Sequence, residues 1–148
     1  AGYARDICAE RHLDLPYSKS YIHSFCSWRC TWHIRQPLNT KEIANCLSLI
    51  QGSHDFSAFR SSGSGNTNPI RSVLSAKLQG PQDGLLRLII EADGFLRHMV
   101  RNIVGTLKDA GLGKMGADTF KKILESRDRQ SAGPKAPPQG LFLMQVRY

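Results

Sequence analysis

The sequence predicts an α+β fold in which an antiparallel β-sheet carries helices packed on one face. Segments at 71–78, 85–91 and 141–148 alternate apolar and polar residues as strands do, and other segments repeat apolar residues at helical spacing. The order of these segments lacks the regularity of βαβ units. At 148 residues the chain is long enough for one domain, which we divide into an unassigned segment, 1–17, and an α/β subdomain, 18–148.

The first predicted strands lie at 20–34, where aromatic and β-branched residues are dense. We expect Pro37 to end this region, since proline has no backbone N–H for a sheet. Asn39 and Glu42 are spaced as the capping box of a helix. The apolar positions of that helix are Ile43, Cys46, Leu47 and Ile50. We interpret Cys46 as a reduced thiol in the core.

A β-hairpin is predicted from strands at 71–78 and 85–91, joined by a turn at 80–84 that is rich in glycine and proline. Period-two alternation predicts two apolar faces, Leu74, Ala76 and Leu78 on the first strand and Leu86, Leu88 and Ile90 on the second.

The strongest helical pattern starts at Gly94 and has a wide apolar stripe, which predicts close packing on the sheet. Glycines at 111–116 break it, and Asp118 is placed to cap a shorter helix. That helix would bury Phe120, Ile123 and Leu124. A proline-rich loop at 132–140 and a final strand at 141–148 complete the chain.

The chain is basic: 20 Lys and Arg against 12 Asp and Glu give a net charge of +8. Such a charge suits a polyanionic partner, with nucleic acid ahead of an acidic membrane surface, although a solvated basic surface is the alternative. No apolar run approaches the ~20 residues that span a bilayer, and the first residues do not form a signal peptide. We therefore expect a cytoplasmic protein that does not enter a membrane.

Basic residues gather on the polar side of the predicted long helix. Arg97, Arg101 and Lys108 would share one face, with His98 and Asn102 one step round. A solvated face is the simplest interpretation. Arg101, however, lies at the margin of the apolar stripe, so we expect it to be partly buried and to require a carboxylate or phosphate partner.

Tyr21 alternates with Lys19 and His23 in a predicted strand, where it is either a core or edge aromatic or a ring that stacks on a planar base. Segments 15–41 and 56–82 contain basic and aromatic residues but no acid, a pattern that suits RNA, although the aromatics are equally consistent with a core. Phosphate-binding loops, dinucleotide fingerprints, serine-nucleophile motifs and metal-ligand spacings are missing from the sequence. We expect no metal and no nucleotide cofactor.

Residues 95–105, FLRHMVRNIVG, closely resemble the C-terminal half of the tRNA pseudouridine synthase A family. Three further stretches resemble the family in the same order: Lys19-Ser20-Tyr21, HDFSAFR at 54–60 and ESRDRQSAGPKAPPQGLFL at 125–143. The resemblance covers roughly residues 18–148.

This resemblance implies an isomerase that converts uridine to pseudouridine in the anticodon stem-loop of tRNA, using an aspartate nucleophile and neither metal nor cofactor. Arg101 matches the arginine that pairs with the nucleophile, and Tyr21 matches the tyrosine that stacks on the base. The implied contacts to the RNA backbone are Lys19, Arg60, Arg71, Arg97 and His98. The family also implies a cytoplasmic homodimer with tRNA as its partner.

One departure limits the resemblance. The family's nucleophile lies in a segment like GRTDxGVHA, and here the nearest string is Arg5-Asp6-Ile7-Cys8-Ala9, so we do not assign the nucleophile to Asp6. We expect a C-terminal portion of the enzyme that lacks its N-terminal half and is inactive alone. A non-catalytic RNA-binding module of the same fold is the alternative, and a structural protein of a ribonucleoprotein is a third.

Overall fold

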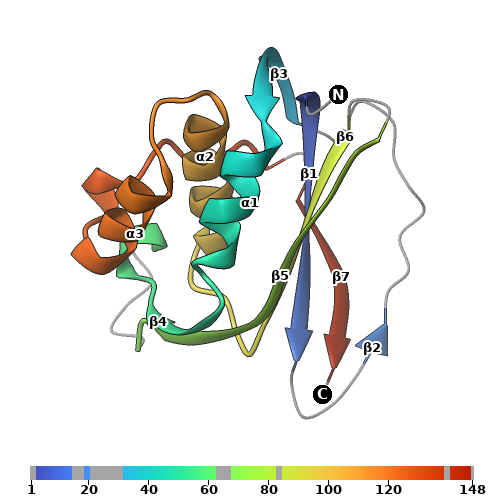
Figure 1. Ribbon diagram of the computed structural model, residues 1–148. Helices are drawn as coiled ribbons and strands as arrows, with labels where there is room; N and C mark the ends of the chain where they lie inside the picture. The colour runs from blue at the N-terminus through green and yellow to red at the C-terminus, as the bar shows by residue number, and fades with distance from the viewer. Residues whose placement is uncertain are drawn as a thin grey trace.

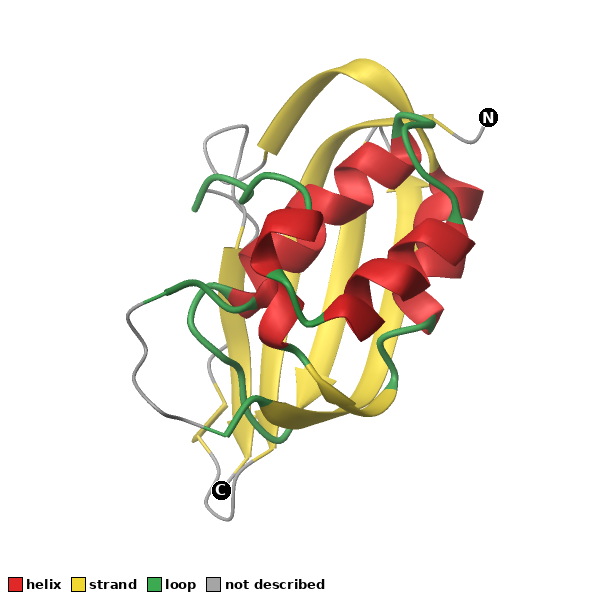
Figure 2. Ribbon diagram, turned by 90° about the vertical axis from the view of Figure 1, so that its left-hand side faces the viewer, coloured by secondary structure: helices red, strands yellow, loops and turns green. Residues whose placement is uncertain are grey.

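The computed structural model describes residues 3–14, 19–20, 32–62, 68–82, 85–138 and 141–147. These residues form a seven-stranded sheet with three helices, α1 (Thr40–Ser48), α2 (Met99–Gly111) and α3 (Ala117–Ser126). All three helices lie on the same face of the sheet (Figures 1 and 2). The predicted α+β class, with helices on one face, is confirmed.

The sheet has the strand order β2-β7-β1-β6-β5-β4, with β3 paired to β1. The strands are β1 (Tyr3–Asp14), β2 (Lys19–Ser20), β3 (Trp32–Asn39), β4 (Gly52–Asp55), β5 (Ile70–Gln82), β6 (Leu85–Ala92) and β7 (Leu141–Arg147). Four neighbouring pairs are antiparallel, as predicted, but β1 runs parallel to β6 and to β7. The sheet is therefore mixed, because long connections separate β1 from both parallel neighbours and permit that direction.

Strand β1 occupies the middle of the sheet, although the sequence of 1–17 predicts no element. Along one edge β1 pairs with β6 from Asp6 to Leu13, and along the other it pairs first with β3 and then with β7. Register shifts between Ala4 and Asp6 and between Arg11 and His12 interrupt the strand. These shifts break the period-two pattern on which strand prediction depends.

The predicted β5–β6 hairpin is confirmed, but its turn is not at 80–84 as predicted. Strand β5 continues through Gly80 and Pro81 to Gln82, which pairs with Leu85 after a register shift between Gln79 and Gln82. Leu86, Leu88 and Ile90 are fully buried beneath the helices, as expected. On β5 the register shifts between Val73 and Ser75, so Val73 and Ala76 are buried while Leu74 is 53% exposed. The prediction that Leu74 shares a buried face with Ala76 is wrong because this bulge reverses the alternation.

Helix α1 begins after Asn39, the N-cap that the capping pattern predicts. The Asn39 side chain accepts hydrogen bonds from the backbone N–H groups of Lys41 (3.1 Å) and Glu42 (3.4 Å). Cys46 is fully buried, and burial together with the nearby Glu42 carboxylate raises the pKa of its thiol to about 11. Pro37 does not end the preceding strand, because it lies where the β1–β3 register shifts and no regular ladder hydrogen bond is needed.

The periodicity predicts that the long helix starts at Gly94, but helix α2 starts at Met99. His98 adopts a left-handed conformation (φ 57°), and the Arg97 carbonyl accepts a hydrogen bond from the Ser61 N–H instead of a helical one. Arg97 and His98 therefore precede the helix and do not share its face with Arg101 and Lys108. Helix α3 buries Phe120, Ile123 and Leu124 as predicted, but Gly116, not Asp118, is its N-cap.

Candidate functional site

Arg101 lies in the first turn of α2 and is held by a loop that crosses that helix. We name residues 128–138 the crossing loop. The Arg101 Nε donates to the Ala136 carbonyl oxygen (2.9 Å), and the Ala136 N–H donates to the Arg101 carbonyl oxygen (3.0 Å). The Arg101 side chain is half-buried, as the sequence predicts. Its Nε is thereby fixed by backbone, and within the described part of the chain no hydrogen bond holds its two terminal nitrogens.

The crossing loop approaches α2 closely at two glycines, and at Gly105 the approach leaves no room for a side chain. A Cβ on Gly105 would overlap the Pro134 carbonyl group, and a Cβ on Gly133 would lie 2.7 Å from the Asp109 carboxylate. The Gly133 N–H also donates to the buried Thr106 hydroxyl (3.0 Å). Glycine at 105 is thus required by the close approach of two backbones.

Asn102 connects the crossing loop to the segment that follows β4. Its side chain is fully buried, and its Nδ2 donates to the Phe59 carbonyl oxygen (2.6 Å) and lies 3.3 Å from the Ser61 hydroxyl. Its Oδ1 accepts from Arg129 Nη2 (3.0 Å), while Arg129 Nη1 donates to the Gly133 carbonyl oxygen (2.9 Å). The sequence pattern predicts a place for Asn102 on the polar side of the helix and does not predict this buried role. A polar residue inside a strongly apolar helix was the available signal.

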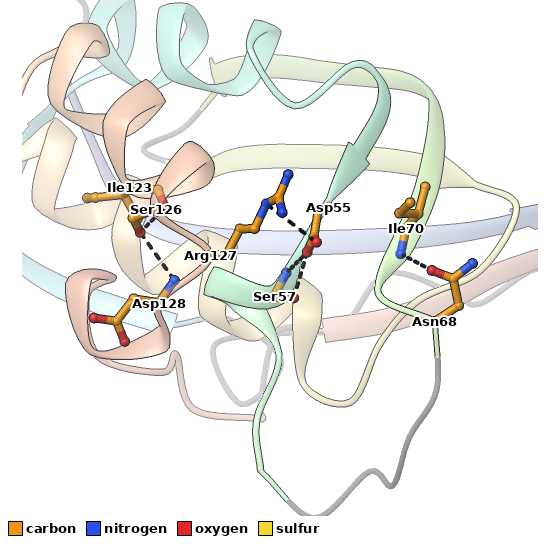
Figure 3. Close-up of polar contacts among 8 residues, drawn as sticks. All are labelled: Asp55, Ser57, Asn68, Ile70, Ile123, Ser126, Arg127 and Asp128. Carbon is orange, nitrogen blue, oxygen red and sulfur yellow. Dashed lines mark hydrogen bonds and ion pairs between the residues drawn. The ribbon is translucent and has the colours of Figure 1, made fainter.

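The HDFSAFR segment at 54–60 forms the end of β4 and the 3₁₀ turn η2 (Ser57–Phe59). Asp55 Oδ1 accepts from the Ser57 N–H (2.9 Å) and hydroxyl (2.6 Å), and Arg127 Nε lies 3.6 Å from Asp55 Oδ2 (Figure 3). Partial burial acts to raise the pKa of Asp55, but the bonds from Ser57 and the charges of Arg127 and Arg60 lower it overall. The charged carboxylate therefore stabilises this turn.

The two ends of the loop that follows η2 are joined at its base. The Phe56 N–H donates to the Pro69 carbonyl oxygen (3.1 Å), and Asp55 pairs with Ile70 between β4 and β5. Asn68 Oδ1 accepts from the Ile70 N–H (3.1 Å) (Figure 3). This base fixes where Arg60 leaves η2, with its N–H bonded to the Ser57 carbonyl oxygen (3.3 Å).

Four basic side chains meet beside the start of α2: Arg97, His98, Arg101 and Lys135. Lys135 Nζ lies 3.4 Å from His98 Nδ1, and Arg97 Nη1 donates to the Ser62 carbonyl oxygen (3.3 Å). Burial, followed by the charges of Lys135, Arg101 and Arg97, lowers the pKa of His98. The structure thus brings together three predicted site residues and adds Lys135, which no sequence pattern indicated.

Other predicted residues lie elsewhere. Arg71 Nη1 donates to the carbonyl oxygens of Asn68 (2.6 Å) and Ile70 (2.8 Å), so it supports the loop base. Lys108 lies over the Trp32 ring, 5.1 Å from its centroid, and not beside Arg101. Lys19 lies in β2, where its backbone pairs with Val146 of β7. Tyr21 lies outside the described residues.

Residues 47–148 match the family model described as tRNA pseudouridine synthase. The chain belongs to this family. The matched range contains the segments at 54–60, 95–105 and 125–143, whose contacts build the site around Arg101, whereas Lys19 and Tyr21 precede it.

Several curated relatives are similar along most of this chain. The tRNA pseudouridine synthase A of Thermoanaerobacter sp. (strain X514) is 43% identical over 142 residues, which are 96% of this chain and 54% of that protein. The tRNA pseudouridine synthase A of Acetivibrio thermocellus is 40% identical over 139 residues, 94% of this chain and 56% of that protein. The chain therefore spans about half the length of these relatives. Both matches extend into residues 1–17, where the sequence pattern alone indicated a poor resemblance.

Across the described ranges, no helix is both long and apolar enough to cross a bilayer. The same ranges contain no group of three or more His, Cys, Asp or Glu side chains arranged to hold a metal ion.

Proposed function

We propose that this chain is the C-terminal portion of a tRNA pseudouridine synthase that isomerises uridine in the anticodon stem-loop. Arg101 would pair with a nucleophilic aspartate supplied from outside the chain. The observation that carries this proposal is the Arg101 side chain, half-buried and fixed at Nε by the Ala136 carbonyl oxygen. A cytoplasmic homodimer is part of the same proposal and rests on the family resemblance.

The chemistry explains why an arginine is needed. In the isomerisation the bond between uracil N1 and the sugar breaks, the base rotates, and a new bond joins its C5 to the sugar. The C5 proton leaves and N1 gains a proton, so the product is an isomer of the substrate. A carboxylate nucleophile must stay ionised in a site from which water is excluded. The two terminal nitrogens of Arg101 can bind both carboxylate oxygens, which holds the charge and the orientation together.

The remaining site residues have supporting roles in the proposal. Tyr21 would stack on the target base after it leaves its own stack. Lys19, Arg60, Arg71, Arg97 and His98 would contact the RNA backbone. The reaction requires neither a metal nor a cofactor, since a carboxylate nucleophile and a base that rotates within the site account for each bond.

The nucleophile is expected in the half of the relatives that this chain does not span. Asp6 is not a substitute by sequence, and its backbone is paired on both sides within β1, to Leu85 and to His33. The string around Asp6 also lacks the glycine and threonine that precede the aspartate, and the histidine that follows it, in the GRTDxGVHA segment.

The test is release of tritium from tRNA labelled at uridine C5. The chain alone is compared with the chain joined to the half of the Thermoanaerobacter relative that it lacks. We expect release from the joined protein and none from the chain alone. Release by the chain alone would overturn the proposal that the nucleophilic aspartate lies outside this chain. Asp6 would then be the first residue to substitute. RNA binding without any release from the joined protein would favour the non-catalytic RNA-binding module.

A further inference from the structure

We propose that Lys135, His98 and Arg97 form a binding site for one phosphate of the RNA backbone, directly beside Arg101. This inference rests on the proposed function, because it takes RNA to be the ligand. It adds Lys135 to the RNA-binding residues and gives His98 a specific role, that of a neutral hydrogen-bond donor.

The three residues come from two segments that α2 and the crossing loop bring together. Lys135 Nζ lies 3.4 Å from His98 Nδ1, although the residues are 37 positions apart. Lys135 precedes Ala136, which forms reciprocal hydrogen bonds with Arg101. His98 directly precedes α2, in a left-handed conformation that turns it out of the helical path. Arg97 is exposed and reaches Ser62 from the same turn.

The cluster lacks a negative counterpart within the described part of the chain. The contacts of Arg97, Arg101 and Lys135 there are to carbonyl oxygens or to the His98 ring, and the ion pair between Arg127 and Asp55 lies elsewhere. Positive charges held this close repel one another and gain from a shared anion. A phosphate diester has two non-bridging oxygens that share one negative charge and are accessible from several sides, so it suits donors that converge from separate segments.

The contact with Lys135 favours one protonation state of His98. An ammonium group can only donate, so a hydrogen bond from Lys135 Nζ to His98 Nδ1 needs a neutral ring with its proton on Nε2. Burial and the charges of Lys135, Arg101 and Arg97 favour that neutral form by lowering the pKa of His98. The Nε2–H is then available to a phosphate oxygen, and a bound phosphate would raise the pKa again.

The site is rigidly coupled to Arg101. Gly105, Thr106 and Asn102 anchor the crossing loop on α2, and Ala136 anchors it to Arg101 itself. The backbone that carries Lys135 is therefore held in place beside Arg101, and a phosphate bound at Lys135 would lie near the Arg101 guanidinium. Such a contact positions the RNA without reading its sequence.

The first test measures binding of labelled tRNA to this chain as salt is raised from about 50 to about 300 mM. Lys135→Gln is compared with wild type and with Lys122→Gln, which removes an exposed lysine from α3. We expect Lys135→Gln to reduce the slope of log affinity against log salt by about 0.7, the value for one phosphate of a single strand, and Lys122→Gln to leave it unchanged. Equal slopes for the two variants, with wild-type RNA binding intact, would overturn the site and leave the proposed function standing.

The second test uses inorganic phosphate and needs no RNA. The His98 ring is titrated by NMR with and without phosphate, in wild type and in Lys135→Gln. We expect phosphate to raise the pKa of His98 in the wild type and to have a much smaller effect in the variant. A His98 pKa that does not respond to phosphate would overturn the site, whatever the enzyme assay shows.

Discussion

Arg101 and Ala136 are hydrogen-bonded to each other in both directions, although 35 residues separate them. The Arg101 Nε donates to the Ala136 carbonyl oxygen at 2.9 Å, and the Ala136 N–H donates to the Arg101 carbonyl oxygen at 3.0 Å. One bond fixes a side chain and the other fixes the backbone from which it extends. Helix α2 and the crossing loop are therefore fixed to each other at this point.

Replacing Arg101 tests the role proposed for its guanidinium group. Arg101→Lys keeps the charge but loses the Nε bond and the two-pronged grip on a carboxylate, so we expect turnover by the joined protein to fall on the order of 100-fold, or about 2.7 kcal/mol. Arg101→Ala should lower it further, with the fold retained. The measurement is tritium release, with circular dichroism as the check on folding. Near-normal turnover of Arg101→Ala would contradict the role assigned to Arg101.

Gly105→Ala should displace the crossing loop. The added Cβ would overlap the Pro134 carbonyl group, so either the loop or α2 must move, at a cost of about 1–3 kcal/mol in the free energy of unfolding. Gly116→Ala is the matched control, because nothing lies within 4 Å of its Cβ position. Urea denaturation of both variants measures the difference. If Gly105→Ala unfolded at the same urea concentration as Gly116→Ala, the close approach would not constrain this position.

Asn102→Ala should destabilise the protein by about 1–3 kcal/mol, because the Phe59 carbonyl and the Arg129 guanidinium lose a buried partner. Asn45→Ala, at an exposed position of α1, should change stability little. Thermal unfolding of the two variants separates a buried hydrogen-bonded amide from an exposed one. Equal losses would show that the buried network around Asn102 contributes nothing specific.

The ionisation of Asp55 should make stability depend on pH. The pKa of Asp55 is lower in the folded chain than in the unfolded chain, so its contribution is fully present above the ordinary aspartate value near 4 and is lost as pH falls through the folded value. Asp55→Asn should be less stable than the wild type at pH 7. In strong acid, where the Asp55 carboxyl of the wild type is protonated, the two proteins should be about equally stable. Denaturation of both proteins across that range is the measurement. A stability difference that stayed constant from neutral pH into strong acid would contradict the role of the charge.

Local sequence patterns determined the elements whose causes are local. The Asn39 cap, the pairing of β5 with β6 and the buried positions Phe120, Ile123 and Leu124 each follow from residues that lie close together in the chain. The partial burial of Arg101 followed from the apolar stripe beside it. The family resemblance likewise rested on strings that are contiguous in sequence.

Tertiary structure decided the features whose causes are distant. β1 is a central strand because β3, β6 and β7 pair with it, and its own register shifts conceal the strand pattern. Helix α2 starts late because Ser61 binds the Arg97 carbonyl, and Lys135 reaches His98 because the crossing loop packs against Gly105. Hydrogen bonds and close backbone contacts between residues about 35 positions apart leave no periodic trace in a sequence, so only the folded chain reveals them.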